Sequence, residues 1–259
     1  MTDQATAPVV LTERRGRVLV VTLNRPHARN AVDGEVALGV AAAMELLDSD
    51  PELSVGVLTG AGGYFCAGMD LKAFLRGESP RAPGRGFAGL VEATPAKPLI
   101  AAVDGPALAG GFEIVLAADL VVAAPTATFG LPEVRRGLVA AAGGLTRLPA
   151  RLPRAVALEM VLTGKTMTAA QLHPLGLVNR LAPEGEVLTA AVELADEIAA
   201  NGPLAVRASK KVVDESPAWP PAETFERTRQ IVMPVFGSND AREGAAAFTE
   251  RRTPVWTAT

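Results

Sequence analysis

The sequence predicts an α/β fold followed by a helical C-terminal region. Short apolar runs typical of buried strands alternate with helix-like segments over the first half of the 259-residue chain. From Pro153 onward, helical patterns follow one another. Hydrophobic residues make up 49% of the chain, which is enough for a sizeable core. We therefore expect an α/β core over residues 1–200 and a C-terminal helical region over residues 201–259.

The individual elements follow from local patterns. Apolar runs rich in Val, Leu and Ala predict strands at residues 18–23, 55–58, 99–103 and 120–122. Residues 33–47 predict an amphipathic helix, because Asp33 can cap the first turn and apolar residues recur at helical spacing. Further helices are expected at residues 153–162, 185–200, 203–215 and 238–252. Residues 75–98 are rich in glycine, proline and arginine, a composition typical of a mobile loop.

Glu113 carries the clearest chemical signal. It follows two glycines and Phe112 and opens an apolar run in which Asp119 is the only charged residue as far as Ala124. No Lys or Arg lies within four residues of it. Burial on such a face favours the neutral carboxyl and raises its pKa towards the range of a general acid or base. The alternative is a glutamate placed at a helix start, where the helix dipole stabilises an anion.

Glu133 lies twenty residues further on, in TFGLPEVRRGL. Arg135 and Arg136 follow it closely, so a surface ion pair is the simple alternative for this residue taken alone. Two carboxyls at this separation, each next to glycine-rich backbone, nevertheless suit acid/base chemistry.

Two turns offer backbone N–H groups for a negatively charged oxygen. Residues 65–71, FCAGMDL, follow the strand-like residues 54–59, and residues 109–111, AGG, follow the strand expected at 99–103. A strand that runs through small residues into a helix presents free amides at the helix start. Two such turns can hold one oxygen between them, which is an oxyanion hole.

These segments together resemble the enoyl-CoA hydratase/isomerase (crotonase) family. The resemblance rests on FCAGMDLKAF, on PLIAAVDGPALAGGFEIVLAADLVVAAPTATFGLPEVRRGL and on AAGGLTRLP, and extends from NRPHARNAV at residues 24–32 to EGAAAFTERR at residues 243–252. It implies a crotonase-like spiral of repeated ββα units with a C-terminal helical region. It also implies a homotrimer or a homohexamer.

The resemblance implies a reaction and its site. The amides of Met69 and Gly110 would hold the thioester oxygen, while Glu113 and Glu133 would flank a water molecule. Addition of water to an enoyl-CoA needs a base for the water and an acid for the α-carbon. By this resemblance Glu113 orients and deprotonates the water, and Glu133 protonates the α-carbon.

The resemblance also implies where coenzyme A binds, as part of the substrate and with no separate cofactor. The family's nucleotide lies along the loop after the first strand and against the FCAGMDL turn. Two further contacts come from a neighbouring subunit, and the acyl-pocket wall lies near residues 75–98. The positions that match are Arg25, Ala28, Ala67, Asp70, Leu71 and Lys72, with Phe248 and Arg251 from the neighbour. Without the resemblance, residues 25–29 form a solvated basic turn, and the last two residues belong to an amphipathic helix.

Three positions depart from the family pattern. Ala109 replaces the first glycine of a usual triple, Ala140 replaces a proline, and Arg251 replaces a lysine that meets the CoA phosphate. None of them removes a reacting group. The alternatives left open are an enoyl-CoA isomerase, a carnitinyl-CoA dehydratase, and a protein that binds CoA esters without turnover.

Composition excludes other classes of function. A net charge of −3 with few basic runs argues against a nucleic-acid partner. The single Cys66 excludes an internal disulfide and suits a reducing compartment, and it reads as a small buried thiol. His27 and His173 lie beside prolines and do not make a metal site. The start MTDQATAPVV carries no secretion signal, and no apolar run is long enough to cross a bilayer. We expect a cytoplasmic enzyme.

Overall fold

The computed structural model describes residues 7–259. Residues 1–6 lie outside the described part, and with them most of the MTDQATAPVV segment, in which no secretion signal is expected. The main sheet has the strand order β1-β2-β3-β6-β8-β11. β1 is antiparallel to β2, and the other neighbours are parallel. The strands of this sheet are β1 (Val10–Arg15), β2 (Val18–Leu23), β3 (Val55–Gly60), β6 (Leu99–Val103), β8 (Leu120–Ala123) and β11 (Arg180–Leu181).

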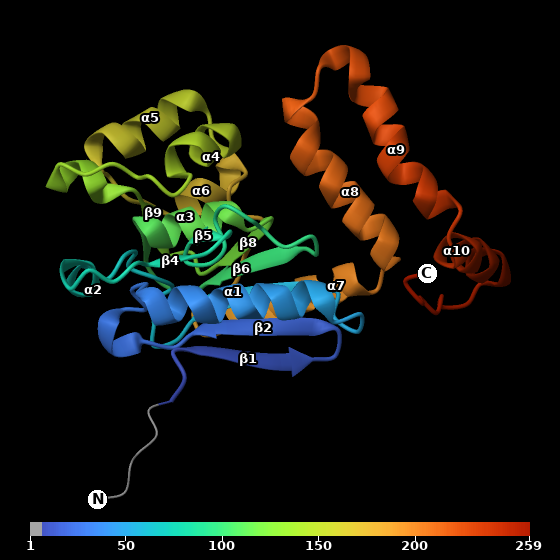
Figure 1. Cartoon of the computed structure of the whole chain (residues 1–259), viewed down its shortest axis with the longest axis horizontal. Helices are drawn as coiled ribbons and strands as arrows, with labels where there is room; N and C mark the ends of the chain where they lie inside the picture. Colours follow the sequence, from blue (N-terminus) through green and yellow to red (C-terminus); the bar gives the residue numbers. More distant parts are fainter. Residues whose placement is uncertain (1–6) are drawn as a thin grey trace, which may run out of the picture.

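Smaller sheets build a second layer above the main sheet (Figure 1). One has the order β10-β9-β7, and the other pairs β4 with β5. Three main-sheet strands, β3, β6 and β8, are each followed along the chain by a short second-layer strand before the chain returns to the main sheet, which gives it a stepwise, spiral course. These strands are β4 (Arg81–Ala82), β5 (Gly86–Phe87), β7 (Ala107–Leu108), β9 (Thr128–Gly130) and β10 (Met167–Thr168).

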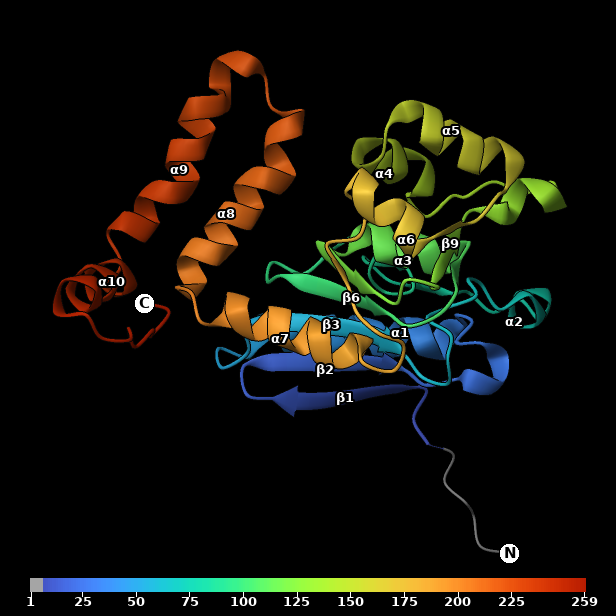
Figure 2. The same ribbon diagram turned by 180° about the vertical axis from the view of Figure 1, so that it is seen from behind.

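Helices cover the sheets on several sides. α1 packs on the side of the main sheet that faces the viewer in Figure 1, and α7 lies on the opposite side, seen in Figure 2. The second layer carries α3 and, above it, α4 to α6. The helices of the core are α1 (Gly34–Ser49), α2 (Leu71–Leu75), α3 (Gly110–Ala117), α4 (Gly144–Arg151), α5 (Arg154–Thr163), α6 (Ala169–Leu172) and α7 (Val187–Ala199), with 3-10 turns η1 (Pro26–Ala28), η2 (Pro132–Arg136) and η3 (His173–Leu175).

The last three helices form a C-terminal arm that projects from the end of the main sheet (Figures 1 and 2). α8 and α9 run side by side as a hairpin, and α10 folds back at its base. The arm consists of α8 (Pro203–Glu215), η4 (Ser216–Ala218), η5 (Pro221–Glu223), α9 (Thr224–Phe236) and α10 (Asn239–Glu250). α2 lies at the opposite end of the molecule from the arm.

The apolar core explains why the predicted strands form. β6 is buried along its whole length, and β2 and β3 have only one partly exposed residue each. Strands covered by helices on both faces read as continuous apolar runs rather than alternating ones. Asp33 caps α1 by accepting a hydrogen bond from the Val36 amide at 2.9 Å, as its position before the helix predicts.

The α/β prediction is confirmed, and most predicted elements lie within two residues of the observed ones. The sequence did not predict β1 or α4, and further corrections concern the later chain and residues 75–98. α9 was not predicted, because it contains Pro234 and follows a proline-rich stretch. Residues 75–98 are not an unstructured loop, since β4 and β5 form a small hairpin there, held by the pairing of Arg81 with Phe87.

Candidate active site

A cavity of about 690 Å³ lies between α2, the start of α3 and η2. Both glutamates singled out in the sequence, Glu113 and Glu133, line it. Met69 and Gly110, from the two glycine-rich turns, line it as well. The structure therefore brings together, in one cavity, four residues that come from three separate segments of the chain.

Glu113 is held in a fixed position inside the protein. Its side chain is only 3% exposed, and Oε1 accepts hydrogen bonds from the amides of Ala142 at 2.7 Å and Gly144 at 2.9 Å. Burial raises its pKa, while the two amides and the charge of Arg147 oppose that rise. One carboxyl oxygen is thus bound by backbone, and the carboxylate form is supported where burial alone would neutralise it.

Glu133 lies in a different environment. It is half-buried on η2, and its Oε2 is buried with no hydrogen-bond partner within residues 7–259. Burial is the main cause that raises its pKa, and the nearby charge of Glu113 raises it further. Its own amide and the charge of Arg136 act in the opposite direction. Unlike Glu113, this carboxyl has no amides from another segment to stabilise its charged form.

The Met69 amide faces the cavity because successive peptide groups of an extended chain point in opposite directions. Val32 pairs with this segment by donating to Gly68 O at 2.8 Å and by accepting from Asp70 N at 2.9 Å. Successive peptide groups of an extended segment point to opposite sides, so the Met69 N–H points away from Val32. Within the described residues this amide donates no hydrogen bond to the protein.

The Met69 amide is free for a different reason from the one that the sequence suggests. It expected a helix start at FCAGMDL, but α2 begins at Leu71, behind its cap Asp70, and has five residues. Met69 lies before that cap, so the bridge to Val32 and not the helix leaves its amide free.

Gly110 is the first residue of α3, where backbone N–H groups lack partners inside the helix. The two turns touch closely, since a Cβ added at Gly68 would lie 3.0 Å from the Gly110 nitrogen. A Cβ added at Gly111 would lie 2.1 Å from Cys66 O, so only glycine permits this approach. The two free amides are therefore neighbours across a tight backbone contact.

Ala109, which stands where the family pattern has glycine, adopts an unusual backbone conformation. Its φ is 51° and its ψ is −128°, a region that residues other than glycine rarely adopt. Its N–H donates to Gly130 O at 2.9 Å, which ties the turn to β9. Despite this substitution, Gly110 is still the first residue of α3.

Arg25 and Asp70, two of the residues matched to CoA contacts, are bound to each other inside the protein. The Arg25 guanidinium lies 3.0 Å from carboxylate oxygens of both Asp33 and Asp70, and its side chain is only 13% exposed. It also donates to Ala31 O at 2.6 Å. The expectation of a solvated basic turn is wrong for Arg25, whose charge ties the turn after β2 to the starts of α1 and α2.

The other matched residues fall into three groups. Ala67 and Leu71 line the cavity, and the Lys72 side chain is exposed beside them on α2. Ala28 lies in η1 and does not line the cavity. Phe248, 87% exposed, and Arg251 lie on the C-terminal arm, at the opposite end of the molecule from α2. Within this chain they do not reach the cavity.

Sequence reasoning missed several residues of the cavity. The exposed Arg29 lines its wall, with its guanidinium 5.3 Å from the centre of the Tyr64 ring. Phe87 lines it from β5, so close to Gly110 that a Cβ there would lie 2.5 Å from the ring. The amides that hold Glu113 come from Ala142, in the loop before α4, and from Gly144, the first residue of α4. Arg29 could have been found from its place in the basic turn, but the other contacts carry no local signal.

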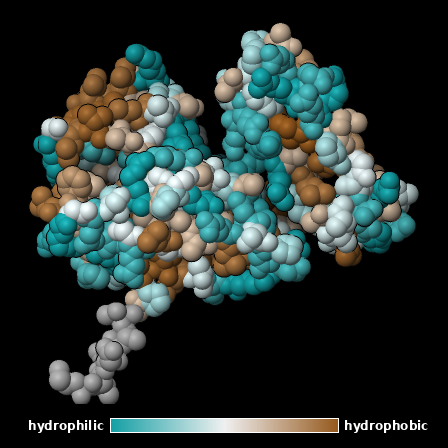
Figure 3. All heavy atoms as spheres, viewed as in Figure 1, coloured by the Kyte–Doolittle hydropathy of each residue, from teal (hydrophilic) through white to brown (hydrophobic). Residues whose placement is uncertain are grey.

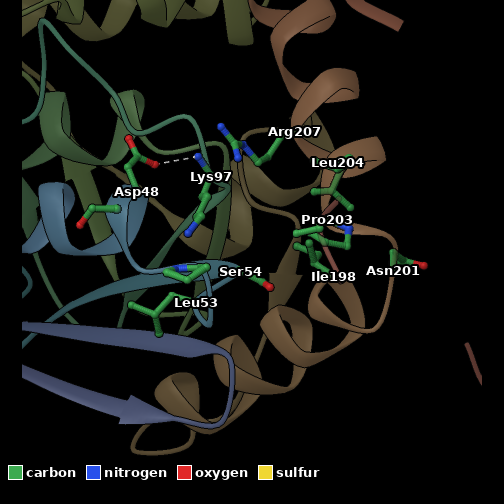
Figure 4. A pocket seen from close by; sticks show the side chains of 13 residues that line it. Asp48, Leu53, Ser54, Lys97, Ile198, Asn201, Pro203, Leu204 and Arg207 are labelled. Atoms are coloured by element: carbon green, nitrogen blue, oxygen red, sulfur yellow. Dashed lines mark hydrogen bonds between the residues drawn. The ribbon is translucent and has the colours of Figure 1, made fainter. Parts of the chain in front are cut away.

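A smaller cavity of about 230 Å³ lies between the end of α1, β3 and the start of α8 (Figure 4). Two of its three charged lining residues, Lys97 and Asp48, are held by hydrogen bonds, and the third is Arg207. The Lys97 ammonium donates to Leu47 O at 2.7 Å and Asp50 O at 2.6 Å, and the Asp48 carboxylate accepts the amides of Ala96 and Lys97. These contacts close the end of α1, so this cavity offers no free acid or base.

The remaining reactive side chains have structural roles. Cys66 is fully buried, and burial raises the pKa of its thiol to about 12, so it is not a nucleophile. His173 bonds through Nδ1 to Val178 O at 2.8 Å. In the part of the chain that the structure describes, no group of three or more His, Cys, Asp or Glu could hold a metal. Over the same residues, no helix is long and apolar enough to span a membrane.

Comparisons with known sequences give matches over nearly the whole chain. A family described as enoyl-CoA hydratase/isomerase matches residues 13–259. Enoyl-CoA hydratase EchA19 of Mycobacterium tuberculosis is 44% identical over 261 residues, covering 98% of each chain. Carnitinyl-CoA dehydratase of Salmonella typhi is 44% identical over 252 residues, covering 94% of this chain and 96% of the other.

Solved structures give the same result for the fold. An enoyl-CoA hydratase from Mycobacterium tuberculosis has a TM-score of 0.96 and 58% identity, covering 97% of this chain and all of the other. A carnitinyl-CoA hydratase from Mycobacterium avium has a TM-score of 0.79 and 48% identity, covering 98% of this chain and all of the other. The spiral fold expected from the sequence is thereby confirmed.

Proposed function

The chain belongs to the enoyl-CoA hydratase/isomerase family, and we propose that it is an enoyl-CoA hydratase, a hydro-lyase that adds water reversibly to a trans-2-enoyl-CoA. The observation that carries the proposal is the shared cavity, in which Glu113 and Glu133 lie with the amides of Met69 and Gly110. A protein that only binds CoA esters has no need of two carboxyls with raised pKa values in one cavity.

The two amides form the oxyanion hole in this proposal. The thioester oxygen accepts hydrogen bonds from Met69 N and Gly110 N, and it carries the negative charge of the enolate during the reaction. The N-terminus of α3 adds a favourable dipole at the same point. Loss of one such donor costs roughly 10²- to 10³-fold in kcat.

The two glutamates divide the proton transfers. Glu113, whose charged form is supported by two amides, takes a proton from water as the water oxygen bonds to the β-carbon. Glu133, whose charged form is disfavoured by burial and by the nearby charge of Glu113, gives a proton to the α-carbon. Dehydration reverses both transfers. After each hydration one proton has moved onto Glu113 and one has left Glu133, so the pair returns to its starting state by proton exchange with water.

Coenzyme A binds as part of the substrate in this proposal, and no separate cofactor takes part. Ala67 and Leu71 supply backbone and apolar contacts at the cavity wall, and the exposed Arg29 and Lys72 supply cations for its phosphates. Ala28 lies in the same turn as Arg29. The ion-paired Arg25 and Asp70 act indirectly, because they fix the two turns against each other.

We also propose that the chain acts as a homotrimer or a homohexamer. Phe248 and Arg251 would then reach the cavity of a neighbouring copy, since they do not reach their own. Large apolar side chains on the C-terminal arm support this, with Phe225 83% and Phe236 73% exposed. Residues 201–259 would serve as the region of oligomerisation and CoA contact, beside a core over residues 1–200. The proposal includes fatty-acid β-oxidation as the pathway and the cytoplasm as the compartment, which a single free cysteine supports.

A carnitinyl-CoA dehydratase is the second candidate, supported by the Salmonella typhi relative. It would use the same oxyanion hole and the same glutamates, so the two candidates differ only in what binds beyond the reacting carbons.

The test is hydration of crotonyl-CoA by the purified protein, followed as loss of the enone absorbance. Glu133→Gln keeps the shape of the side chain but cannot donate the proton, and should lower kcat by roughly 10²- to 10⁴-fold. Arg135→Gln, on the same 3-10 turn, is the matched control and should retain activity. A Glu133→Gln variant with an unchanged rate would refute the assigned role.

A further inference from the structure

A second, apolar chamber of about 330 Å³ lies on the far side of Glu133. It is enclosed by η2, the loop that follows it, and helices α4 and α5. Glu133 is its only charged lining residue, and the others are aliphatic. Leu131, 1% exposed, forms its inner wall, while Leu145 and Leu162 form its outer rim.

This chamber adjoins the active-site cavity. Glu133 and Val139 line both spaces, so these two residues lie on the boundary between them. In the proposed function, Glu133 protonates the α-carbon, which places the reacting double bond at this boundary. Residues 77–81 and Phe87 line the main cavity, where the resemblance implies the wall of the acyl pocket, and the second chamber adds apolar space on the other side of Glu133 for acyl carbons beyond the β-carbon.

We propose that this chamber receives the apolar end of the acyl chain, so that the enzyme prefers neutral, unbranched enoyl-CoA esters of medium length over crotonyl-CoA and over the carnitinyl-type ester. The inference rests on the proposed function. A chamber lined by aliphatic side chains stabilises methylene groups by removing them from water. Each buried methylene contributes about fourfold to kcat/KM, so 2-octenoyl-CoA should exceed crotonyl-CoA by roughly 10²-fold.

The same lining disfavours a trimethylammonium group. Quaternary ammonium groups are bound by aromatic faces or by carboxylates. The chamber contains no aromatic residue among its lining side chains, and its one carboxyl, Glu133, serves as the proton donor in the proposed function. The main cavity has charges of both signs on its wall, with Arg81 and Arg136 beside Glu78. A cationic acyl group therefore finds no aromatic or free carboxylate partner in the second chamber.

A second copy of the chain is the other candidate occupant. Leu145 is 43% exposed and Leu162 is 70% exposed, and hydrophobic side chains gather over α4 and α5 (Figure 3). An exposed apolar patch of this kind is typical of subunit contacts. The acyl chain is favoured because the chamber shares two wall residues with the active site and reaches inward to the buried Leu131.

The experiment compares kcat/KM for crotonyl-CoA, 2-octenoyl-CoA and crotonobetainyl-CoA in variants that fill the chamber. Leu145→Trp should lower the value for 2-octenoyl-CoA at least about tenfold and leave crotonyl-CoA within about twofold. Leu162→Trp, at a more exposed rim position, repeats the test if Leu145→Trp fails to fold. Leu38→Trp is the matched control, because Leu38 is 58% exposed on α1 and lines neither space.

Several outcomes would overturn the inference. These are no gain with chain length in the unchanged protein, equal losses for both enoyl esters in Leu145→Trp, or a preference for crotonobetainyl-CoA. A change in oligomeric mass by light scattering, with the chain-length ratio intact, would assign the chamber to a subunit contact instead. Failure of the proposed function would look different, because no ester would turn over. Calorimetry would then still test whether the chamber binds the acyl chain, through the ratio of the Kd values for octanoyl-CoA and butyryl-CoA.

Discussion

Gly144 offers a direct test of how Glu113 is positioned, because the residue that holds the carboxyl also lies against it. Its amide donates to Glu113 Oε1 at 2.9 Å. A Cβ added at Gly144 would lie 3.0 Å from that oxygen, 3.2 Å from Glu113 Cγ and 2.9 Å from Leu131 Cδ1. Gly144→Ala therefore pushes the carboxyl and the amide apart without removing any reacting group.

The size of the effect follows from these contacts. Relief of the overlap needs a shift of a few tenths of an ångström, roughly, and a displacement of about 1 Å at a reacting group costs about 10²-fold. We expect kcat to fall roughly tenfold. Extra volume at a buried position also costs stability, about 1–3 kcal/mol. Weakening of the Gly144 hydrogen bond removes an influence that lowers the pKa of Glu113, so the acidic limb of the pH profile should move to higher pH.

The assay is crotonyl-CoA hydration across the pH range, with folding checked by thermal denaturation. Gly237→Ala is the matched control, since a Cβ there meets only Pro234 O, at the ordinary distance of 3.6 Å. A folded Gly144→Ala variant with full kcat and an unmoved pH profile would refute the positioning of Glu113 by this loop. An equal loss in Gly237→Ala would show that the effect is not local.

Three further predictions concern stability. Ala109→Gly relieves the conformation at φ 51° and should raise the free energy of unfolding by about 1 kcal/mol, measured in urea, with activity retained. The pKa of Glu133 is raised in the folded protein, so the stability of the wild-type protein falls as pH rises through that pKa. Glu133→Gln cannot lose a proton there, so the Tm of the variant minus the Tm of the wild-type protein should increase from pH 4 to pH 8. Arg25→Met leaves two carboxylates unpaired and should cost about 3–5 kcal/mol, against less than about 1 kcal/mol for Arg14→Met at an exposed pair, both by denaturant titration.

Four strands of the main sheet, β2, β3, β6 and β8, and most long helices could be predicted because their signals are local. β1 was not predicted, because most of its residues are polar and exposed. A buried strand such as residues 99–103 is a continuous apolar run, and the cap at Asp33 adjoins the helix that it starts. The short strands β4, β5, β7, β9 and β10 could not be predicted, because two or three residues carry no periodicity and pair only once the spiral has formed. α9 carries Pro234 near its end, and its tertiary packing against α8 overrides that signal.

For the site, the sequence could identify chemical groups but not their partners. The run around Glu113 predicts burial without a cation. The structure confirms the burial, but the charge of Arg147, on α4, acts on the carboxyl and lowers its pKa. The amides of Ala142 and Gly144 come from about thirty residues later in the chain, so no local pattern reveals them. Arg25 shows the opposite case. The basic residues near it in the sequence suggest a solvated turn, but its guanidinium is paired with two carboxylates that belong to other segments of the chain.

The difference between the two glutamates arises from one stretch of chain. η2 presents Glu133 at one end of this stretch, and Ala142 with Gly144, the first residue of α4, presents two amides at the other. The amides stabilise charge on Glu113, while Glu133 Oε2 is buried without a hydrogen-bond partner among the described residues. Two carboxyls that shared one environment would compete for a single proton. Because their surroundings differ, one can remain a base while the other remains an acid at the same pH, as hydration requires.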